Sequence, residues 1–136
     1  MCYNLFLRIS QSNNYQNIAK DFIYNYCTTA GLNIFFTSIF YTKDTLCSIH
    51  IIGSTNQLYE VIGTDDILKK LNELGITTMK FITQNYTVQP INQNIILITF
   101  HGNVEINGRN YTIISTVLIH IESIPKIHNH IIDIIM

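Results

Sequence analysis

Hydrophobic positions along this chain change their spacing near residue 75. Up to that point apolar residues recur mainly every third or fourth position, which is typical of helices that bury one face. Beyond it they alternate every second position, which is typical of strands. The pattern therefore predicts helices in the first half of the chain and a series of long strands in the second half.

Two helices are expected before residue 41. The first covers residues 14–30, because apolar side chains recur every fourth position at Ile18, Phe22 and Tyr26. The second covers residues 32–40 and is so dense in Phe and Ile that we expect it to be buried on most sides.

A third helix has both of its ends marked in the sequence. Thr64 can cap its start, and Asp65 and Asp66 fall in the first turn, where the helix dipole favours negative charge. Gly75 can adopt the left-handed conformation that ends helices. The apolar residues between these ends share one face: Ile67, Leu68, Leu71 and Leu74.

Strands account for most of the remaining chain. Asn107-Gly108 is a strong signal for a tight hairpin, and that turn predicts His101 opposite Ile114 and His120 opposite Ile95. The expected strands are residues 45–52, 58–62, 77–89, 94–106, 109–122 and 126–135.

Helices followed by a meander of strands predict a single α+β domain over residues 1–136, in which residues 1–12 form an N-terminal extension. That N-terminal stretch could lengthen the first helix, add an edge strand or reach a partner. The long strands are apolar on both faces, and the helices can cover only one of them. We therefore expect a partner to cover the face that carries Ile95, Leu97, Ile114 and Leu118.

Three segments resemble the nuclear transport factor 2-like superfamily. They are the glycine-opened helix from Val61 to Gly75, the spacing of Tyr26 and Tyr41, and the closing segment Asn129-His130-Ile131-Ile132. The resemblance covers roughly residues 14–136. It implies a cone-like, curved antiparallel sheet packed against about three helices in the N-terminal half.

The resemblance also implies partners. Domains of this superfamily pair through the sheet face, so it implies a homodimer or a heterodimer with a homologous domain. Related domains bind Phe-Gly repeats or short Phe motifs in grooves beside the first helix or at the dimer junction. Apolar material for such a groove includes Leu5, Phe6, Tyr15, Phe22 and Phe40, and the alternative is that all five belong to the core. It thus implies a protein–protein interaction module in nucleocytoplasmic transport or RNA–protein assembly.

Recognition of GDP-bound Ran is not expected. The positions that resemble the superfamily's Ran-contacting sites are Ile49, His50, Val88 and Gln89, and none of them is a carboxylate. The charge complementarity needed to pair with a Ran lysine is therefore missing.

Composition excludes two classes of partner. The chain is 47% hydrophobic and 12% charged with a net charge of -1, and its basic residues are scattered rather than clustered. Direct nucleic-acid binding is therefore not expected. Apolar runs are only strand-length, so we expect no membrane span. Cys2, Cys27 and Cys47 are read as reduced thiols, typical of a cytoplasmic or nuclear protein.

Metal binding is not expected either, although the second half of the chain is rich in histidine. His128 and His130 lie two apart on one strand and should share a face, but no cysteine or carboxylate close in sequence completes a site.

Catalysis is the alternative function, since the superfamily includes isomerase-like and dehydratase-like proteins that work inside the cone. His50 could act as a base there, with Tyr24 or Tyr26 as proton donor and Asp44 nearby. The simpler interpretation is a non-catalytic binding module without a cofactor, in which the tyrosines pack. A small-molecule-binding or isomerase-like protein that uses the cone pocket is kept as the alternative.

Overall fold

The computed structural model describes the backbone of residues 2–136 and the side chains of residues 14–82 and 84–136. Helices and strands follow in this order: α1 (Cys2–Leu32), the 3₁₀ helix η1 (Ile34–Phe40), β1 (Leu46–Ile52), β2 (Gln57–Ile62), α2 (Thr64–Glu73), β3 (Lys80–Pro90), β4 (Ile95–Ile106), β5 (Arg109–His120) and β6 (Lys126–Ile135). The N-terminal stretch thus lengthens the first helix, which is one of the three arrangements that the sequence allows.

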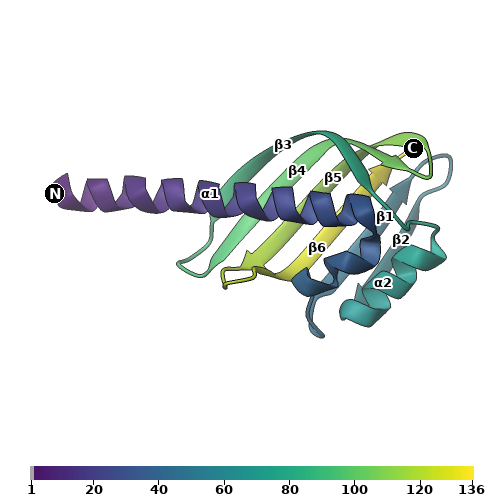
Figure 1. The fold of residues 1–136 in the computed structure, drawn as a ribbon, viewed down its shortest axis with the longest axis horizontal. Helices are drawn as coiled ribbons and strands as arrows, with labels where there is room; N and C mark the ends of the chain where they lie inside the picture. Colours follow the sequence, from purple (N-terminus) through teal and green to yellow (C-terminus); the bar gives the residue numbers. More distant parts are fainter. Residues whose placement is uncertain (1) are drawn as a thin grey trace.

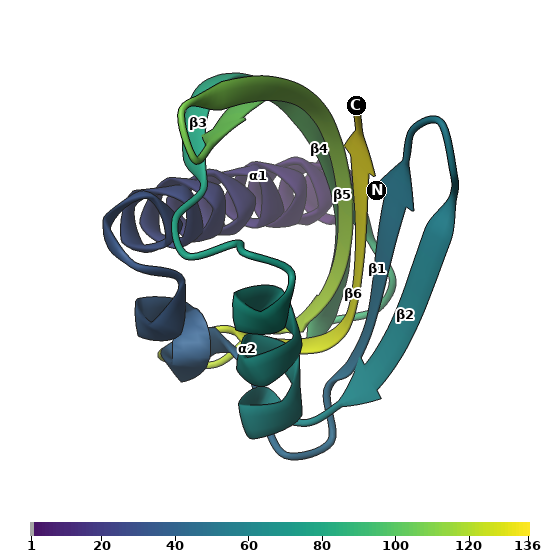
Figure 2. The same ribbon diagram turned by 90° about the vertical axis from the view of Figure 1, so that its right-hand side faces the viewer.

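The strands form one sheet in the order β2-β1-β6-β5-β4-β3 (Figure 1). Neighbouring strands are antiparallel except for β1 and β6, which run parallel. Figure 2 shows that the sheet curls strongly and that α1, η1 and α2 all lie on its concave side. This arrangement confirms the predicted α+β cone, and it leaves the convex side of the sheet without a helix.

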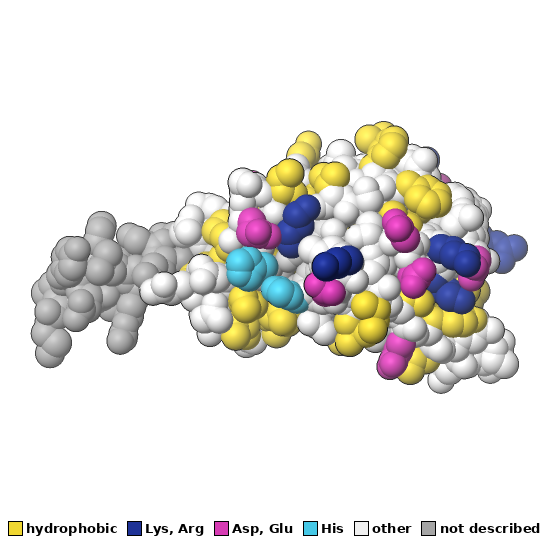
Figure 3. Space-filling model, turned by 90° about the horizontal axis from the view of Figure 1, so that it is seen from below, with side chains coloured by type: hydrophobic (Ala, Val, Ile, Leu, Met, Phe, Trp, Pro, Cys, Tyr) yellow, Lys and Arg dark blue, Asp and Glu magenta, His cyan; other side chains and the backbone are white. Residues whose placement is uncertain are grey.

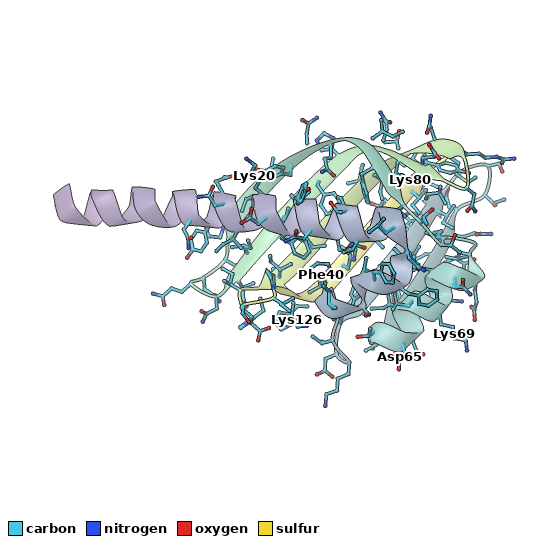
Figure 4. All side chains as sticks on the ribbon, viewed as in Figure 1. Lys20, Phe40, Asp65, Lys69, Lys80 and Lys126 are labelled. Carbon is cyan, nitrogen blue, oxygen red and sulfur yellow. The ribbon has the colours of Figure 1, made fainter. Side chains whose placement is uncertain are left out.

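The concave side is closed by an aromatic cluster. Phe22 and Tyr26 on α1 face Phe40, with ring centroids 5.4 Å apart for Phe22–Phe40 and 5.8 Å for Tyr26–Phe40. Phe100 of β4 joins from the sheet, 6.4 Å from the Tyr26 ring. Figure 4 shows Phe40 inside the fold, beneath α1, whereas Lys20 and Lys80 extend from its surface. The predicted spacing on the first helix therefore identifies the side that faces the core.

The prediction that the second helix, which the structure has as η1, is buried on most sides is wrong. Ile34, Thr37 and Phe40 are buried, whereas Phe35 and Phe36 are 44% and 54% exposed. A 3₁₀ helix has three residues per turn, so only every third residue returns to the core. Its other apolar side chains therefore stay on the surface.

The start of α2 differs from the prediction, whereas its end agrees with it. Gly63, not Thr64, is the N-cap residue, with φ of 93° and no side-chain capping bond. A Cβ on Gly63 would lie 3.0 Å from the carbonyl oxygen of Lys43, so both this tight contact and the positive φ favour glycine. At the other end Gly75 has φ of 79°, as a left-handed helix stop requires.

The β4–β5 hairpin confirms the predicted register. Asn107 and Gly108 have φ of 55° and 78°, as a two-residue type I′ turn demands. His101 lies opposite Ile114, and His120 lies opposite Ile95.

The strand before this hairpin begins later than predicted, at Lys80 rather than residue 77. The amide of Ile34 donates to the Thr77 carbonyl at 2.8 Å, and the amide of Met79 donates to the Ala30 carbonyl at 2.9 Å. Residues 77–79 therefore bond to the helical layer instead of to a neighbouring strand.

His128 and His130 do not share a face, contrary to the prediction. The pairing of β5 with β6 shifts between Leu118 and Ile119, where a bulge places one additional residue on β6. As a result His130 is buried inside the cone, while His128 is exposed.

Candidate functional site

The convex sheet face carries an apolar surface that no helix covers. Leu97 of β4 lies directly opposite Leu118 of β5, and Ile95 and Ile114 alternate onto the same face. All four residues of the predicted dimer face are therefore on one side of the sheet. Ile114 is 37% exposed, and Ile131 of β6 joins the face at 45% exposed. We call these five residues the outer face.

Small polar side chains separate the apolar residues of the outer face. Thr116 lies between Ile114 and Leu118 on β5, opposite both Thr99 of β4 and Ile131 of β6. Ile114, at one end of the outer face, lies between His101 of β4 and Asp133 of β6. The centre of the face, around Thr116, carries no charged side chain, and depletion of charge at the centre is typical of protein interfaces.

The four residues at the Ran-like positions are divided between the two sheet faces. Ile49 is fully buried in the core, and Val88 is half-buried on the inner face opposite Ile98. His50 and Gln89 point to the convex side, but they lie on β1 and β3, which three strands separate. The structure therefore does not bring the four residues together.

The residues of the catalytic alternative are also dispersed. Strand alternation places His50 on the convex side, where its Nδ1 lies 3.5 Å from an Asp133 carboxylate oxygen. Tyr26 is buried in the cone, whereas Tyr24 is 68% exposed on the outside of α1. Asp44 is exposed in the turn before β1. His50 therefore pairs with a carboxylate instead of a tyrosine.

Another histidine makes the bond to tyrosine. The hydroxyl of Tyr41 lies 2.9 Å from His130 Nδ1 and 2.9 Å from the hydroxyl of Tyr26. On the other side of the ring, His130 Nε2 lies 2.7 Å from Ser115 Oγ. A neutral imidazole has one N–H, so His130 donates one of these two bonds and accepts the other. The four residues form a buried hydrogen-bonded chain, named here the core chain.

Burial sets the protonation of the core chain. Loss of water lowers the pKa of His130 from 6.5 to about 3, so the ring is neutral at physiological pH. The same loss of water raises the pKa of the Tyr26 and Tyr41 hydroxyls well above their ordinary value. The core chain therefore joins α1, the C-cap residue of η1, β5 and β6 through neutral groups.

Sequence reasoning missed the core chain, although one signal was present. His130 stands at an inward position of a strand otherwise filled by isoleucine, and a buried imidazole needs hydrogen-bond partners. The partners lie 89 and 15 residues away along the chain, so only the fold identifies them.

The interior of the cone is filled by side chains. Phe22, Tyr26, Phe100 and Ile49 are each at most 1% exposed. None of the described surface grooves is lined by a member of the core chain. His130 itself is 1% exposed.

A groove runs beside α1. One part of ≈ 330 Å³ has Phe22 and Phe40 at its floor, and an adjoining part of ≈ 280 Å³ includes Ile39 and Ile124. The latter two side chains are each 47% exposed. Tyr15 lies against the core at the preceding turns of α1. The side chains of Leu5 and Phe6, also expected near such a groove, lie outside the described residues.

Other histidines lie at the surface. The rings of His120 and His128 meet edge to face with centroids 5.6 Å apart, and His120 Nδ1 is 4.0 Å from a Glu122 carboxylate oxygen.

In the part of the chain whose side chains are described, no three His, Cys, Asp or Glu residues are grouped closely enough to hold a metal ion. Figure 3 shows acidic and basic side chains intermixed on the face seen from below Figure 1. Within the same described residues, no helix has the length and apolar character to cross a membrane.

The sheet is strongly curved, and the helices on its concave side come before most of its strands in the sequence. This arrangement is the nuclear transport factor 2-like fold, and this chain has that fold. Three similar solved structures support this assignment. A chain in the yeast deubiquitinase Ubp3 and Bre5 cofactor complex superposes with a TM-score of 0.67 at 22% identity, covering 89% of this chain and 97% of that chain.

Nuclear transport factor 2 from Cryptosporidium parvum gives a TM-score of 0.67 at 18% identity, covering 88% of this chain and 94% of that chain. A chain in the Candida albicans complex of Mtr2 with the Mex67 M domain gives 0.68 at 15% identity, covering 89% and 94%. No protein-family model and no curated protein matches the chain. The likeness to these structures establishes the fold.

Proposed function

We propose that this protein is a non-catalytic protein–protein interaction module whose outer face pairs with a domain of the same fold. A second copy of the chain is the simplest such domain, and a homologous chain is the other. The observation that carries the proposal is the apolar outer face: Ile114 and Ile131 remain 37% and 45% exposed although the helices fill the concave side. Burying that area against another sheet removes it from water.

The similar structures support a protein partner. Two of them are complexes between proteins, namely Ubp3 with Bre5 and Mtr2 with the Mex67 M domain. A third is a nuclear transport factor. By analogy, we assign this module to nucleocytoplasmic transport or RNA–protein assembly, in the cytoplasm, the nucleus or both.

A Phe-containing motif is the second partner that we propose, and the groove beside α1 is its site. An aromatic ring can enter the groove between the exposed side chains of Ile39 and Ile124, above Phe22 and Phe40, which are almost fully buried. A buried aromatic anchor in an apolar groove commonly supplies most of the affinity of such contacts.

Ran recognition remains unexpected in this proposal. Of the four Ran-like positions, His50 and Gln89 are on the convex side, and neither of them is a carboxylate. The nearby carboxylate of Asp133 already lies 3.5 Å from His50 Nδ1. The packed interior of the cone also favours binding over catalysis, because the core chain lies beyond the reach of the described grooves.

The motif site is tested by titrating the protein with a Phe-Gly-repeat peptide and, separately, with GDP-bound Ran. Saturable binding to the peptide alone is expected. Ile39→Asp should weaken peptide binding about tenfold or more, because it places a charge beside the aromatic anchor. Ile91→Asp is the matched control, since Ile91 is 56% exposed in the β3–β4 loop and does not line the groove.

Three outcomes of this titration would count against the proposal. Equal weakening by Ile39→Asp and Ile91→Asp would place the motif elsewhere. Binding of Ran would show that the charge argument at His50 and Gln89 is wrong. Absence of peptide binding would remove the Phe motif from the proposal. The pairing is tested separately by aspartate substitutions at Ile114 and Leu118, described below.

A further inference from the structure

The strand β2 forms one edge of the sheet, and within the described chain nothing pairs with its outer side (Figure 2). An edge strand directs every second N–H and C=O away from its neighbour, so it can add another strand. The adjacent helix α2 packs against the concave side of β2, where Lys70 Nζ lies 4.9 Å from the Tyr59 ring centroid. The backbone edge itself stays open.

The convex side of β2 has a symmetric pattern of exposed side chains. Leu58 and Ile62 are each 60% exposed, and the carboxylate of Glu60 lies between them. Across the β1 pairing, Leu58 faces His50 and Ile62 faces Leu46, which is 40% exposed. A strand added beside β2 would therefore meet an apolar, an acidic and an apolar position in turn.

A second copy of β2 fits this pattern poorly. Residues directly opposite each other in an antiparallel pair lie on the same face, so a two-fold pairing centred on Glu60 sets it against its own copy. Centring the pair on Tyr59 sets Glu60 against Leu58, and centring it on Val61 sets Glu60 against Ile62. Each of these registers buries a carboxylate against a like charge or an apolar side chain.

A basic residue on the added strand, directly opposite Glu60, would avoid both of these unfavourable pairings. Cross-strand pairs of opposite charge stabilise an antiparallel sheet, whereas like charges directly opposite destabilise it. On the same face, the carboxylate of Asp133 lies 3.5 Å from His50 Nδ1. Among the described side chains, Glu60 forms no ion pair with a cation.

We propose that the β2 edge binds an extended peptide segment in which a Lys or Arg stands between two apolar residues at alternate positions. The segment adds a seventh strand to the sheet. Its backbone bonds to the open edge, its apolar side chains cover Leu58 and Ile62, and its cation pairs with Glu60. The site uses the edge of the sheet and does not depend on pairing through the outer face or on the Phe-motif groove.

The probe is the blocked peptide Thr-Val-Thr-Lys-Thr-Val-Thr, titrated into the isotope-labelled protein while backbone amide signals are followed by NMR. Saturable shifts centred on residues 57–62 are expected. A matched peptide with Glu in place of Lys should bind about fivefold more weakly. A third peptide keeps Lys but carries N-methyl groups on alternate backbone amides, and it should lose binding because the bonds to the edge cannot form.

Reversing the charge at residue 60 tests whether Glu60 recognises the peptide or only prevents the β2 edge from pairing with another copy. Glu60→Lys should reverse the preference, so that the Glu peptide binds better than the Lys peptide. Glu105→Lys is the control and should leave the preference unchanged, because Glu105 lies on β4, four strands from β2.

Several results would overturn the proposal. No saturable binding of the Lys peptide, or shifts that map away from residues 57–62, would exclude the site. An unchanged preference in Glu60→Lys would mean that Glu60 only discourages self-association of the edge. Loss of folding in Glu60→Lys would be visible in its amide spectrum, and Glu60→Gln, which should bind the two peptides about equally, then replaces it.

Discussion

At the scale of the residue, His130 makes the stability of the protein depend on pH. Its ring occupies an inward position of β6 and bonds to Tyr41 on one side and Ser115 on the other, at 2.9 Å and 2.7 Å. Burial lowers its pKa from 6.5 to about 3, because the interior disfavours the charged imidazolium. The folded state therefore excludes a proton that the unfolded chain accepts.

We predict an acid-dependent loss of stability from this one residue. The contribution of neutral His130 is complete above pH 6.5 and is lost as pH falls from 6.5 toward about 3, since the unfolded state then binds the additional proton. The slope should be about 1.4 kcal/mol per pH unit in that window. Urea unfolding at pH 7 and pH 5 measures it.

The matched variant for this measurement is His130→Gln, which keeps hydrogen-bonding atoms but cannot titrate. Its stability difference between pH 7 and pH 5 should be smaller than that of the wild type by about 2 kcal/mol. His128→Gln is the control, because His128 is exposed. Equal pH dependence in all three proteins would mean that His130 is not the group that resists protonation.

Gly63 is a second residue whose identity follows from backbone geometry. Its φ is 93°, which side chains rarely adopt, and a Cβ at this position would approach the Lys43 carbonyl oxygen to 3.0 Å, so the backbone at Lys43 would have to shift. We predict that Gly63→Ala lowers the free energy of unfolding by about 1–3 kcal/mol. Gly53→Ala, at an exposed turn without positive φ, should change it by less than about 0.5 kcal/mol. Similar effects in both variants would contradict the backbone argument.

Local sequence patterns predicted contacts between residues that are close along the chain, but not the hydrogen-bond partners of His130. The Asn107-Gly108 turn sets the pairing of His101 with Ile114 through its own geometry, so short-range reasoning suffices there. His130 is different, because its partner Tyr41 is 89 residues away, in the segment between η1 and β1. Partners distant along the chain require the tertiary fold.

At the scale of the element, η1 and the bulge in β6 show where the hydrophobic pattern misleads. The density of Phe and Ile in residues 34–40 predicted burial all round, but a three-residue period buries only Ile34, Thr37 and Phe40. Likewise, one additional residue in β6 moves His128 to the outside. Both features change which side a residue faces without changing composition.

The period of η1 makes a direct prediction about stability. Ile34→Ala removes a fully buried side chain and should cost about 2–4 kcal/mol. Phe35→Ala removes a larger side chain that is 44% exposed, and it should cost less than about 1 kcal/mol. Chemical unfolding of both variants measures the difference. A larger loss in Phe35→Ala would show that η1 turns its other side to the core.

At the scale of the whole molecule, the division of the sheet into a filled concave side and an uncovered convex side determines the proposed function. Figure 1 and Figure 2 show every helix on one side of the sheet. The alternation of apolar residues on both faces of β4 and β5 made this division predictable from the sequence. The identity of the proposed partner depends on the surface of a second chain, which the pattern of this chain does not encode.

Sedimentation equilibrium of the wild type, Ile114→Asp and Leu118→Asp tests the central claim most directly. For pairing between copies, the wild type should have twice the mass of one chain at micromolar concentration, and each variant should have the mass of one chain. Both substitutions place a carboxylate in an apolar interface, which costs several kcal/mol of association. Ile91→Asp, outside the outer face, should keep the doubled mass. A doubled mass in both outer-face variants, or a single-chain mass for the wild type up to about 100-fold higher concentration, would contradict pairing of two copies through this face.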